Sequence, residues 1–363
     1  MKFKEYRLEP YKIKYRQKVI ELECQQWGVN RELNEKYFHW KYEENPYSQD
    51  ILGVVVLHGN RLIGFNGLLV TQWAIFPKKN FFYMLQLCDA IVDKEYRGNG
   101  IHKAMLRFMC DYYGHSKYRL ITQYSGWKIS IDNAMKIGWI PIYRRNYYQK
   151  YSIVGLFYLV LTKMNVVKEK EKNITLSTHD NIEISKNIYA DSMVKAIAKQ
   201  TYDNKKMVLW KDESYLKWRF RNPRHQYIFF YQWHKQTNHL INYVVFRTSL
   251  NRKNAKLVDF ACTDIEKFSN LIGFVVRSGL FKTISILETN EQDPHIKYIL
   301  NQYRFKKEYS IINIKKKLRK KNDRTILIKP LTKVNGEESW FINGVDIKNP
   351  ENWLFLEIGS DNV

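Results

Sequence analysis

The chain has few cysteines, which limits the kinds of domain that it can form. Only four are present among 363 residues, none in a C-x-x-C pair and none at a metal-ligand spacing with histidine. A disulfide scaffold and a zinc site are therefore not expected, no metal is assigned, and a reducing compartment such as the cytoplasm suits the chain. The cysteines are Cys24, Cys88, Cys110 and Cys262.

Long apolar runs are missing as well. The N-terminal stretch MKFKEYRLEPYKIKYRQ has no apolar segment of the kind that signal peptides contain. The longest apolar run, residues 153–161, is too short to cross a bilayer, which takes about 20 residues. We expect a buried strand or helix there, and a peripheral membrane contact is the less favoured alternative.

Acidic residues are scarce relative to basic ones: 36 Asp and Glu stand against 60 Lys and Arg, so the formal net charge is +24. A field of this sign attracts anions such as phosphorylated cofactors, nucleotide-sugars, nucleic acids or an acidic membrane surface. The alternative is a solvated surface over which the basic residues are scattered. The basic run at 315–321 is interpreted as an exposed helix face or linker rather than as an anion site.

The chain contains an internal repeat. Residues 37–47 read YFHWKYEENPY and residues 215–227 read YLKWRFRNPRHQY; both place a Trp three residues after a Tyr, then a basic-aromatic pair and Asn-Pro. Each is followed by two strand-like runs that turn residues separate, within 51–70 and 227–248. Duplication of one unit explains the shared order of elements.

The repeat continues along both halves. Short buried-strand patterns at 118–124 and 282–288 are each followed by a helix and a further strand, at 130–144 and 295–308. These patterns predict two similar α/β domains in tandem. The charged segment at about 163–175 is typical of a linker. We therefore expect the domains to be residues 1–165 and 166–363.

Residues 84–113 predict a strand, a turn and a helix. MLQLCDAIV is apolar and has the length of a strand, and DKEYRGNG has the composition of a turn. The apolar residues that follow recur on one helical face, as an amphipathic surface helix requires. They are Ile101, Ala104, Met105, Phe108, Met109 and Tyr112.

The turn ends in Arg97-Gly98-Asn99-Gly100, directly before the predicted helix. Glycines have no Cβ and let a ligand approach the backbone, and the helix N-terminus offers amide donors and a positive dipole end. A pyrophosphate fits these properties. The pattern is neither a P-loop, because Ile-His follows the second glycine, nor a G-x-G-x-x-G fingerprint. The alternative is an ordinary glycine turn, since short glycine motifs are common.

The block AIVDKEYRGNGIHKAML resembles the acyl-CoA motif of the GNAT superfamily, a strand followed by [Q/R]-x-x-G-x-[G/A] and a helix. Here the hexad is EYRGNG, so its first position is Glu. Residues 136–139, Lys-Ile-Gly-Trp, resemble a later segment of that family. The resemblance is good over about 50–145 and weaker beyond. It implies two tandem GNAT-like α/β (α+β) domains, each with a mixed, mostly antiparallel sheet flanked by helices.

The second half departs from this pattern. Residues 258–276 occupy the place of the motif but contain no glycine pair. We therefore expect a GNAT-like second domain without a working CoA loop, which shapes the acceptor site instead.

The resemblance also implies acetyl-CoA, or another acyl-CoA, as co-substrate. Backbone N–H groups at the end of the motif strand would face the thioester carbonyl, the glycine loop would hold the pyrophosphate, and a serine on the later helix would lie on the cofactor side. The implied cofactor-binding residues are Ala90, Ile91, Val92, Arg97, Gly98, Asn99, Gly100, Ile101 and Ser130.

Asp89 is the predicted general base, because a carboxylate on an apolar strand beside the expected thioester is costly without a role. The alternative is a carboxylate that a nearby cation or backbone group pairs. His102 and His115 are weaker candidates. The Tyr that acts as an acid in many family members would fall at Ala134. Tyr124 is therefore the predicted substitute, with water or no acid as the alternatives.

The leading function is an N-acyltransferase that moves an acetyl or similar group to a small-molecule amine. Tandem chains with a W-K-Y-x-x-N-P entry resemble enzymes of surface-glycan assembly, so an amino-sugar or nucleotide-sugar of surface polysaccharide biosynthesis is the expected acceptor. A Fem-type aminoacyl-tRNA-dependent peptidyl transferase is the alternative that the positive charge favours and the RGNG loop disfavours. A basic nucleic-acid-binding module is the third, although no recognisable motif supports it.

Overall fold

The computed structural model of the chain describes residues 5–124, 126–151, 178–179, 181–200, 202, 205–248, 254–288, 294–307, 322–332 and 336–360. It divides into two compact units. The first comprises Met1–Arg144, Asn204–Trp210 and Lys317–Trp353, and the second comprises Arg145–Asp203, Lys211–Lys316 and Leu354–Val363. This interleaved grouping differs from the contiguous division at residue 165 that the sequence predicted. The segments 153–161, 163–175 and 315–321 lie outside the described residues.

The first unit is built on a nine-stranded mixed sheet with the order β1-β2-β3-β4-β5-β18-β7, and β11 pairs with β3 and β21 at its side. The pair β4 and β5 is parallel, and the other pairs along this order are antiparallel. The strands are β1 (Arg7–Pro10), β2 (Leu52–His58), β3 (Arg61–Ile75), β4 (Asn80–Val92), β5 (Tyr118–Gln123), β7 (Ile140–Arg144), β11 (Met207–Leu209), β18 (Thr325–Pro330) and β21 (Trp353–Leu354).

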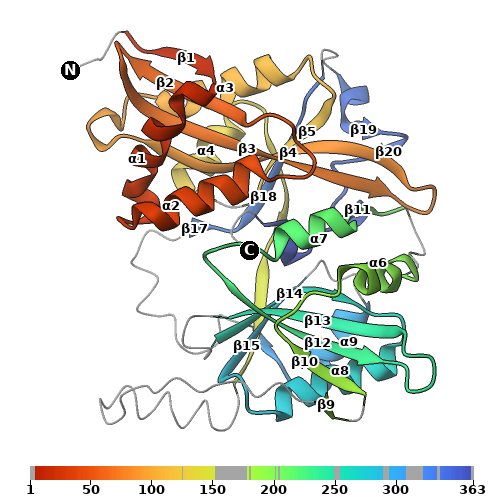
Figure 1. Cartoon of the computed structure of the whole chain (residues 1–363). Helices are drawn as coiled ribbons and strands as arrows, with labels where there is room; N and C mark the ends of the chain where they lie inside the picture. The colour runs from red at the N-terminus through yellow and green to blue at the C-terminus, as the bar shows by residue number, and fades with distance from the viewer. Residues whose placement is uncertain are drawn as a thin grey trace. The chain divides into compact units, whose positions relative to one another are not determined.

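Helices cover both faces of this sheet, because its strands are apolar on both sides (Figure 1). On β2, Val54 and Val56 pack with the helices α3 (Ile101–Tyr113) and α4 (Lys128–Met135). The alternate residues Val55 and Leu57 pack on the opposite face with α1, α2 and the π-helical turn η2. These last three elements are α1 (Arg16–Trp27), α2 (Arg31–Phe38) and η2 (His39–Glu43).

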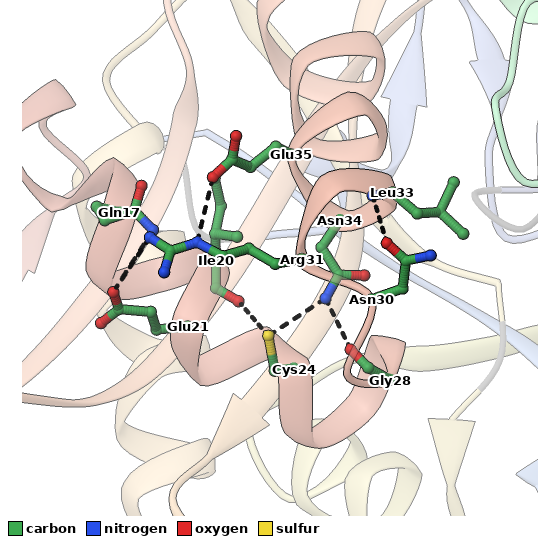
Figure 2. Close-up of polar contacts among 10 residues, drawn as sticks. All are labelled: Gln17, Ile20, Glu21, Cys24, Gly28, Asn30, Arg31, Leu33, Asn34 and Glu35. Atoms are coloured by element: carbon green, nitrogen blue, oxygen red, sulfur yellow. Dashed lines mark hydrogen bonds and ion pairs between the residues drawn. The ribbon is translucent and has the colours of Figure 1, made fainter.

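The corner between α1 and α2 is fixed by polar contacts (Figure 2). The buried Asn34 side chain donates to the carbonyl of Gly28 at 2.7 Å and to the sulfur of Cys24 at 3.2 Å. Asn30 caps α2 by accepting from the amide of Leu33 at 3.0 Å. The corner therefore holds the end of α1, including Trp27, in one place against the sheet.

The second unit contains an eight-stranded sheet with the order β16-β8-β15-β14-β13-β12-β10-β9, in which only β14 and β15 are parallel among the described pairs. The strands are β8 (Asn146–Tyr151), β9 (Thr178–His179), β10 (Ile182–Ser185), β12 (Gln226–Trp233), β13 (Leu240–Thr248), β14 (Asn254–Ala261), β15 (Thr283–Glu288) and β16 (Lys306–Lys307). The helices are α6 (Ala190–Ala198), α7 (Glu213–Arg219), α8 (Ile265–Arg277) and α9 (Pro294–Gln302).

Successive residues of β12 again point to opposite faces. The ring centroids of Phe230 and of Phe274 in α8 are 6.5 Å apart, and the hydroxyl of Tyr231 lies 3.7 Å from the sulfur of Met193 in α6.

Short elements complete the two units. They are η1 (Ile13–Tyr15), η3 (Lys94–Tyr96), β6 (Gly126–Trp127), β17 (Asn322–Asp323), η4 (Glu337–Trp340), β19 (Phe341–Ile342), β20 (Val345–Asp346), η5 (Pro350–Asn352) and η6 (Glu357–Gly359).

Two strands belong to sheets that their positions in the sequence would not suggest. Strand β8 follows β7 after a single residue, yet it lies in the second sheet, between β15 and β16. Strand β18, from near the end of the chain, lies in the first sheet, between β5 and β7. Each unit thus takes an inner strand from the other half of the sequence.

Most predicted elements are confirmed. The two strand pairs that follow the repeated motif are β2–β3 and β12–β13, the motif strand lies within β4, and the predicted helix begins at Ile101 as α3. The mixed α/β class with sheets flanked by helices is confirmed as well. Within the described ranges, no helix has the length and hydropathy that crossing a bilayer requires.

Candidate functional site

The motif strand separates from its neighbour and carries a β-bulge. Parallel pairing of β4 with β5 runs from Tyr83 to Gln86, and β4 then continues to Val92 paired with β3. The β3–β4 register shifts between Phe65 and Gly67, so that Asp89 and Ala90 together oppose one residue of β3. Ala90 is exposed. The predicted positions 90–92 therefore lie on a part of β4 beyond its pairing with β5.

The glycine loop leads from this strand into α3. Gly98 and Gly100 have φ of 84° and 76°, a left-handed region that favours glycine, and Gly100 is the N-cap of α3. No side chain caps this helix end and its first turn has no acidic residue. The loop is tied to the strand because Arg97 donates from Nε to the carbonyl of Val92 at 2.9 Å, while Asn99 donates to the carbonyl of Tyr96 at 3.0 Å.

These features fit the pyrophosphate of an acyl-CoA. A Cβ at Gly98 or Gly100 would meet no atom within 4 Å, so the space in front of the loop is open. The amides at the start of α3 have no side-chain acceptor of their own, and they lie at the positive end of a 13-residue helix. The predicted residues Arg97 to Ile101 are thus brought together at one helix end, and their binding role stays a prediction.

Ser130 of α4 lies beside this helix end, and its place on the cofactor side stays a prediction. Its hydroxyl is 3.2 Å from Nε2 of His102 and accepts from the side-chain amide of Gln123 at 3.0 Å. Burial lowers the pKa of His102 to about 4, so the imidazole is neutral at pH 7. A group with such a pKa is a weak base at neutral pH. His115 is exposed just beyond the other end of α3.

The carboxylate of Asp89 is buried and paired, which is the alternative that the sequence left open. It lies 2.7 Å from Nζ of Lys41, accepts from the hydroxyl of Tyr42 at 2.7 Å, and accepts from the indole of Trp27 at 3.3 Å. Lys41 has no exposed surface. Sequence reasoning missed these partners, although Lys41 and Tyr42 are the basic-aromatic pair in the first copy of the repeated motif. The role of Asp89 as general base stays a prediction.

A second carboxyl group lies near Asp89. Glu23 of α1 is fully buried, and neither of its oxygens has a hydrogen-bond partner among the described residues. Burial is the main cause that raises the pKa of Glu23 well above its usual range, and the negative charge of Asp89 raises it further.

Tyr124, the predicted acid, follows β5 and is also buried, with 2 % of its surface exposed. Its role as acid stays a prediction.

The second unit repeats the buried aspartate but not the glycine loop. Asp259 of β14 lies 2.6 Å from Nζ of Lys211 and accepts from the hydroxyl of Tyr243 at 2.7 Å. A register shift in the β13–β14 pairing adjoins it. The following helix α8 is capped by Asp264, which accepts from the amide of Lys267 at 3.0 Å. An acidic cap at this helix end disfavours an anion there.

No group of His, Cys, Asp and Glu able to hold a metal ion occurs among the residues that the structure describes. Residues 16–126 match the family described as "Acetyltransferase (GNAT) family". A comparison with curated protein sequences gave no match.

Solved structures resemble the chain over most of its length. A protein of unknown function from Enterococcus faecalis V583, described as a probable N-acyltransferase, is 11 % identical with a TM-score of 0.57, over 90 % of this chain and 73 % of that one. A tandem GNAT protein of the clavulanic acid biosynthesis pathway is 10 % identical with a TM-score of 0.52, over 91 % and 100 %. Saccharomyces cerevisiae N-myristoyltransferase with bound myristoyl-CoA is 8 % identical with a TM-score of 0.54, over 98 % and 86 %.

These similarities confirm the tandem GNAT-like fold that the sequence predicted. The matched residues 16–126 contain α1, α2, the bulged strand β4, the glycine loop and α3. Residues 16–126 are therefore a GNAT-family acetyltransferase domain, and the chain as a whole has a tandem GNAT-like fold.

Proposed function

We propose that the chain transfers an acetyl or similar acyl group from acyl-CoA to the amino group of a small, phosphorylated acceptor, with an amino-sugar or nucleotide-linked amino-sugar of surface polysaccharide biosynthesis as the preferred class. The observation that carries the proposal is the glycine loop at the uncapped N-terminus of α3, which follows a strand that has separated from β5. This arrangement offers main-chain donors to an anion and to a carbonyl group at adjacent positions.

The chain contributes binding and orientation. Amides of Gly98 to Ile101 hold the pyrophosphate, and the exposed Arg97 adds positive charge beside it. The main chain of β4 from Ala90 to Val92 donates to the acyl carbonyl and thereby stabilises negative charge on its oxygen. The bound acyl-CoA supplies the activated acyl group as a thioester. For the two proton transfers the sequence predicts Asp89 as base and Tyr124 as acid, and the buried pairing of Asp89 with Lys41 favours a different role for Asp89.

The class of acceptor is inferred from charge. The net charge of +24 favours an acceptor that carries phosphate, and a nucleotide-sugar combines phosphate with an amino group. The four cysteines are free, which suits a reducing compartment, so we place the activity in the cytoplasm. The same charge favours aminoacyl-tRNA as the donor in a Fem-type peptidyl transferase. We prefer acyl-CoA because a tRNA-linked donor has no pyrophosphate for the glycine loop to hold.

Calorimetry with acetyl-CoA tests the proposal directly. We expect micromolar binding by the native chain and no measurable binding by the Gly98→Glu/Gly100→Glu variant, because two carboxylates would fill the open space before the loop and repel the pyrophosphate. Gly59→Glu is the matched control. Gly59 also has a positive φ, of 56°, and open space around it, but it lies in the turn between β2 and β3.

The outcomes separate the two donors. Binding that the loop variant loses and the Gly59 variant keeps supports the acyl-CoA site and calls for an acceptor screen that begins with amino-sugar nucleotides. A folded native chain that does not bind acetyl-CoA refutes the proposal, and binding of aminoacyl-tRNA would then be measured in the same way.

A further inference from the structure

Asp89 adopts a backbone conformation that needs support. Its φ is 51°, in the left-handed region, where non-glycine residues are uncommon. Asp and Asn are among the residues that tolerate this region best, but the conformation persists only where the surroundings hold it. It places Asp89 on the same side of the sheet as the preceding Cys88, since the hydroxyl of Tyr42 contacts both side chains, at 2.7 and 3.3 Å.

Three donors hold the carboxylate in this position. Lys41 and Tyr42 come from η2, and Trp27 comes from the end of α1. Tyr42 can reach Asp89 only because β3 has a glycine beside it: a Cβ at Gly67 would lie 2.1 Å from the Tyr42 hydroxyl. The missing side chain at Gly67 therefore leaves the space that the Tyr42 hydroxyl occupies.

The second unit supplies an independent observation. Asp259 occupies the equivalent place, since Leu87-Cys88-Asp89 and Leu257-Val258-Asp259 stand at corresponding points of β4 and β14. It too is buried, is paired with a lysine, accepts from a tyrosine hydroxyl and adjoins a register shift. Yet β14 leads to no glycine pair. The buried aspartate thus accompanies the bulge, in the presence or absence of the CoA loop.

We propose that Asp89 is a positioning residue rather than the general base: its contacts with Lys41 and Tyr42 hold the β4 bulge in the form that directs the main chain of Ala90 to Val92 toward the acyl carbonyl. The inference rests on the proposed acyl-CoA site. Ala90 is exposed immediately after the anchored residue, and β4 has already separated from β5 at this point. The anchor therefore governs how well the chain distinguishes acetyl-CoA from CoA, which lacks the carbonyl.

The test is the ratio of the CoA and acetyl-CoA dissociation constants, measured by calorimetry without an acceptor. The wild-type chain should prefer acetyl-CoA by about 2- to 12-fold, the equivalent of one net hydrogen bond. Asp89→Asn keeps the shape and the left-handed preference but removes the charge. We expect it to bring the ratio to about 1 while its affinity for CoA stays within about twofold, because the glycine loop is unchanged.

Tyr42→Phe removes one hydroxyl and no charge, so it tests the same anchor in a chain that folds if Asp89→Asn does not. We expect a smaller fall in the ratio. Tyr243→Phe, which removes the corresponding hydroxyl from Asp259, is the matched control and should leave the ratio at the wild-type value.

A base acts on the acceptor amine, so loss of a base alone would not move this ratio. An unchanged ratio in folded Asp89→Asn and Tyr42→Phe chains overturns the positioning role. If the wild-type chain binds neither CoA nor acetyl-CoA, the proposed acyl-CoA site is refuted. This result differs from an unchanged ratio, which refutes only the positioning role of Asp89.

Discussion

Nε2 of His102 lies 3.2 Å from the hydroxyl oxygen of Ser130, and this contact joins the first turn of α3 to α4. Gln123 donates to the same hydroxyl from the end of β5. The three side chains connect the glycine-loop helix, the later helix and the strand that separates from β4. His102 therefore helps to hold these elements of the candidate site together, and we expect its protonation to change the stability of the fold.

Protonation of His102 should destabilise the fold at low pH. Burial lowers its pKa to about 4, against about 6.5 in an unfolded chain, so between these values the unfolded state binds a proton that the folded state does not. Stability is expected to fall as pH drops from about 6.5 to 4, by up to about 3 kcal/mol from this group. Urea unfolding of wild type and His102→Gln at pH 7, 5.5 and 4.5 measures the difference. Parallel curves would contradict the prediction, and His115→Gln, at an exposed site, should follow the wild type.

Glu23 should give the opposite pH dependence. Because burial and Asp89 raise its pKa in the folded state, the folded chain keeps a proton that the unfolded chain loses above about pH 4.5. The stability that this group contributes is present below pH 4.5 and is lost as pH rises through the folded-state pKa. The free energy of unfolding of Glu23→Gln, relative to that of the wild type, should therefore rise by on the order of 1 kcal/mol from pH 4.5 to pH 8. Thermal unfolding at both pH values checks this, with the exposed Glu21→Gln as control.

Removing one partner of the Lys211–Asp259 ion pair should destabilise the chain more than removing both. Both side chains are almost fully buried, with 2 % and no exposed surface. Lys211→Met leaves an unpaired buried carboxylate and should lower the free energy of unfolding by about 3–5 kcal/mol. The double variant Lys211→Met/Asp259→Asn removes both charges and should recover most of that loss. Denaturant unfolding of the four chains gives the coupling energy, and additive effects would refute the argument.

Leu327 should be essential to the first unit although it lies near the end of the chain. It belongs to β18 and is fully buried in a core with Leu85 and Met105. Leu327→Ala should cost about 2–5 kcal/mol and speed hydrogen exchange in β5 and β7, its partners in the sheet. Leu257→Ala in β14 is the control and should affect β13 and β15 first. Unchanged exchange in β5 and β7 would argue against the prediction.

The elements around the glycine loop could be predicted because their signals are local. The apolar face of α3 consists of residues that are about one helical turn apart, and the turn residues between β2 and β3 are adjacent in the sequence. The bulge at Asp89 left no such signal, because two residues opposing one is a property of the pairing with β3. The apolar surroundings correctly marked Asp89 as buried, but they did not reveal that Lys41 pairs with it.

The exchange of β8 and β18 could not be predicted for a related reason. A strand pattern shows which residues face a core, but it does not name the neighbouring strand. Asn146–Tyr151 follows β7 so closely that local reasoning assigns it to the first domain, and residues 325–330 are far nearer in sequence to the second. Only long-range pairing decides both cases, and this is why the predicted contiguous domains differ from the observed units.

The position of β18 also orders events during synthesis. Residues 1–144 are synthesised before residue 325. Strands β5 and β7 therefore lack β18, the strand that lies between them, until most of the second half of the chain has been made. The first sheet can therefore be completed only after β18 has been synthesised. The two sequence repeats are therefore not separable at about residue 165, since a chain that ends there lacks the strand that lies between β5 and β7.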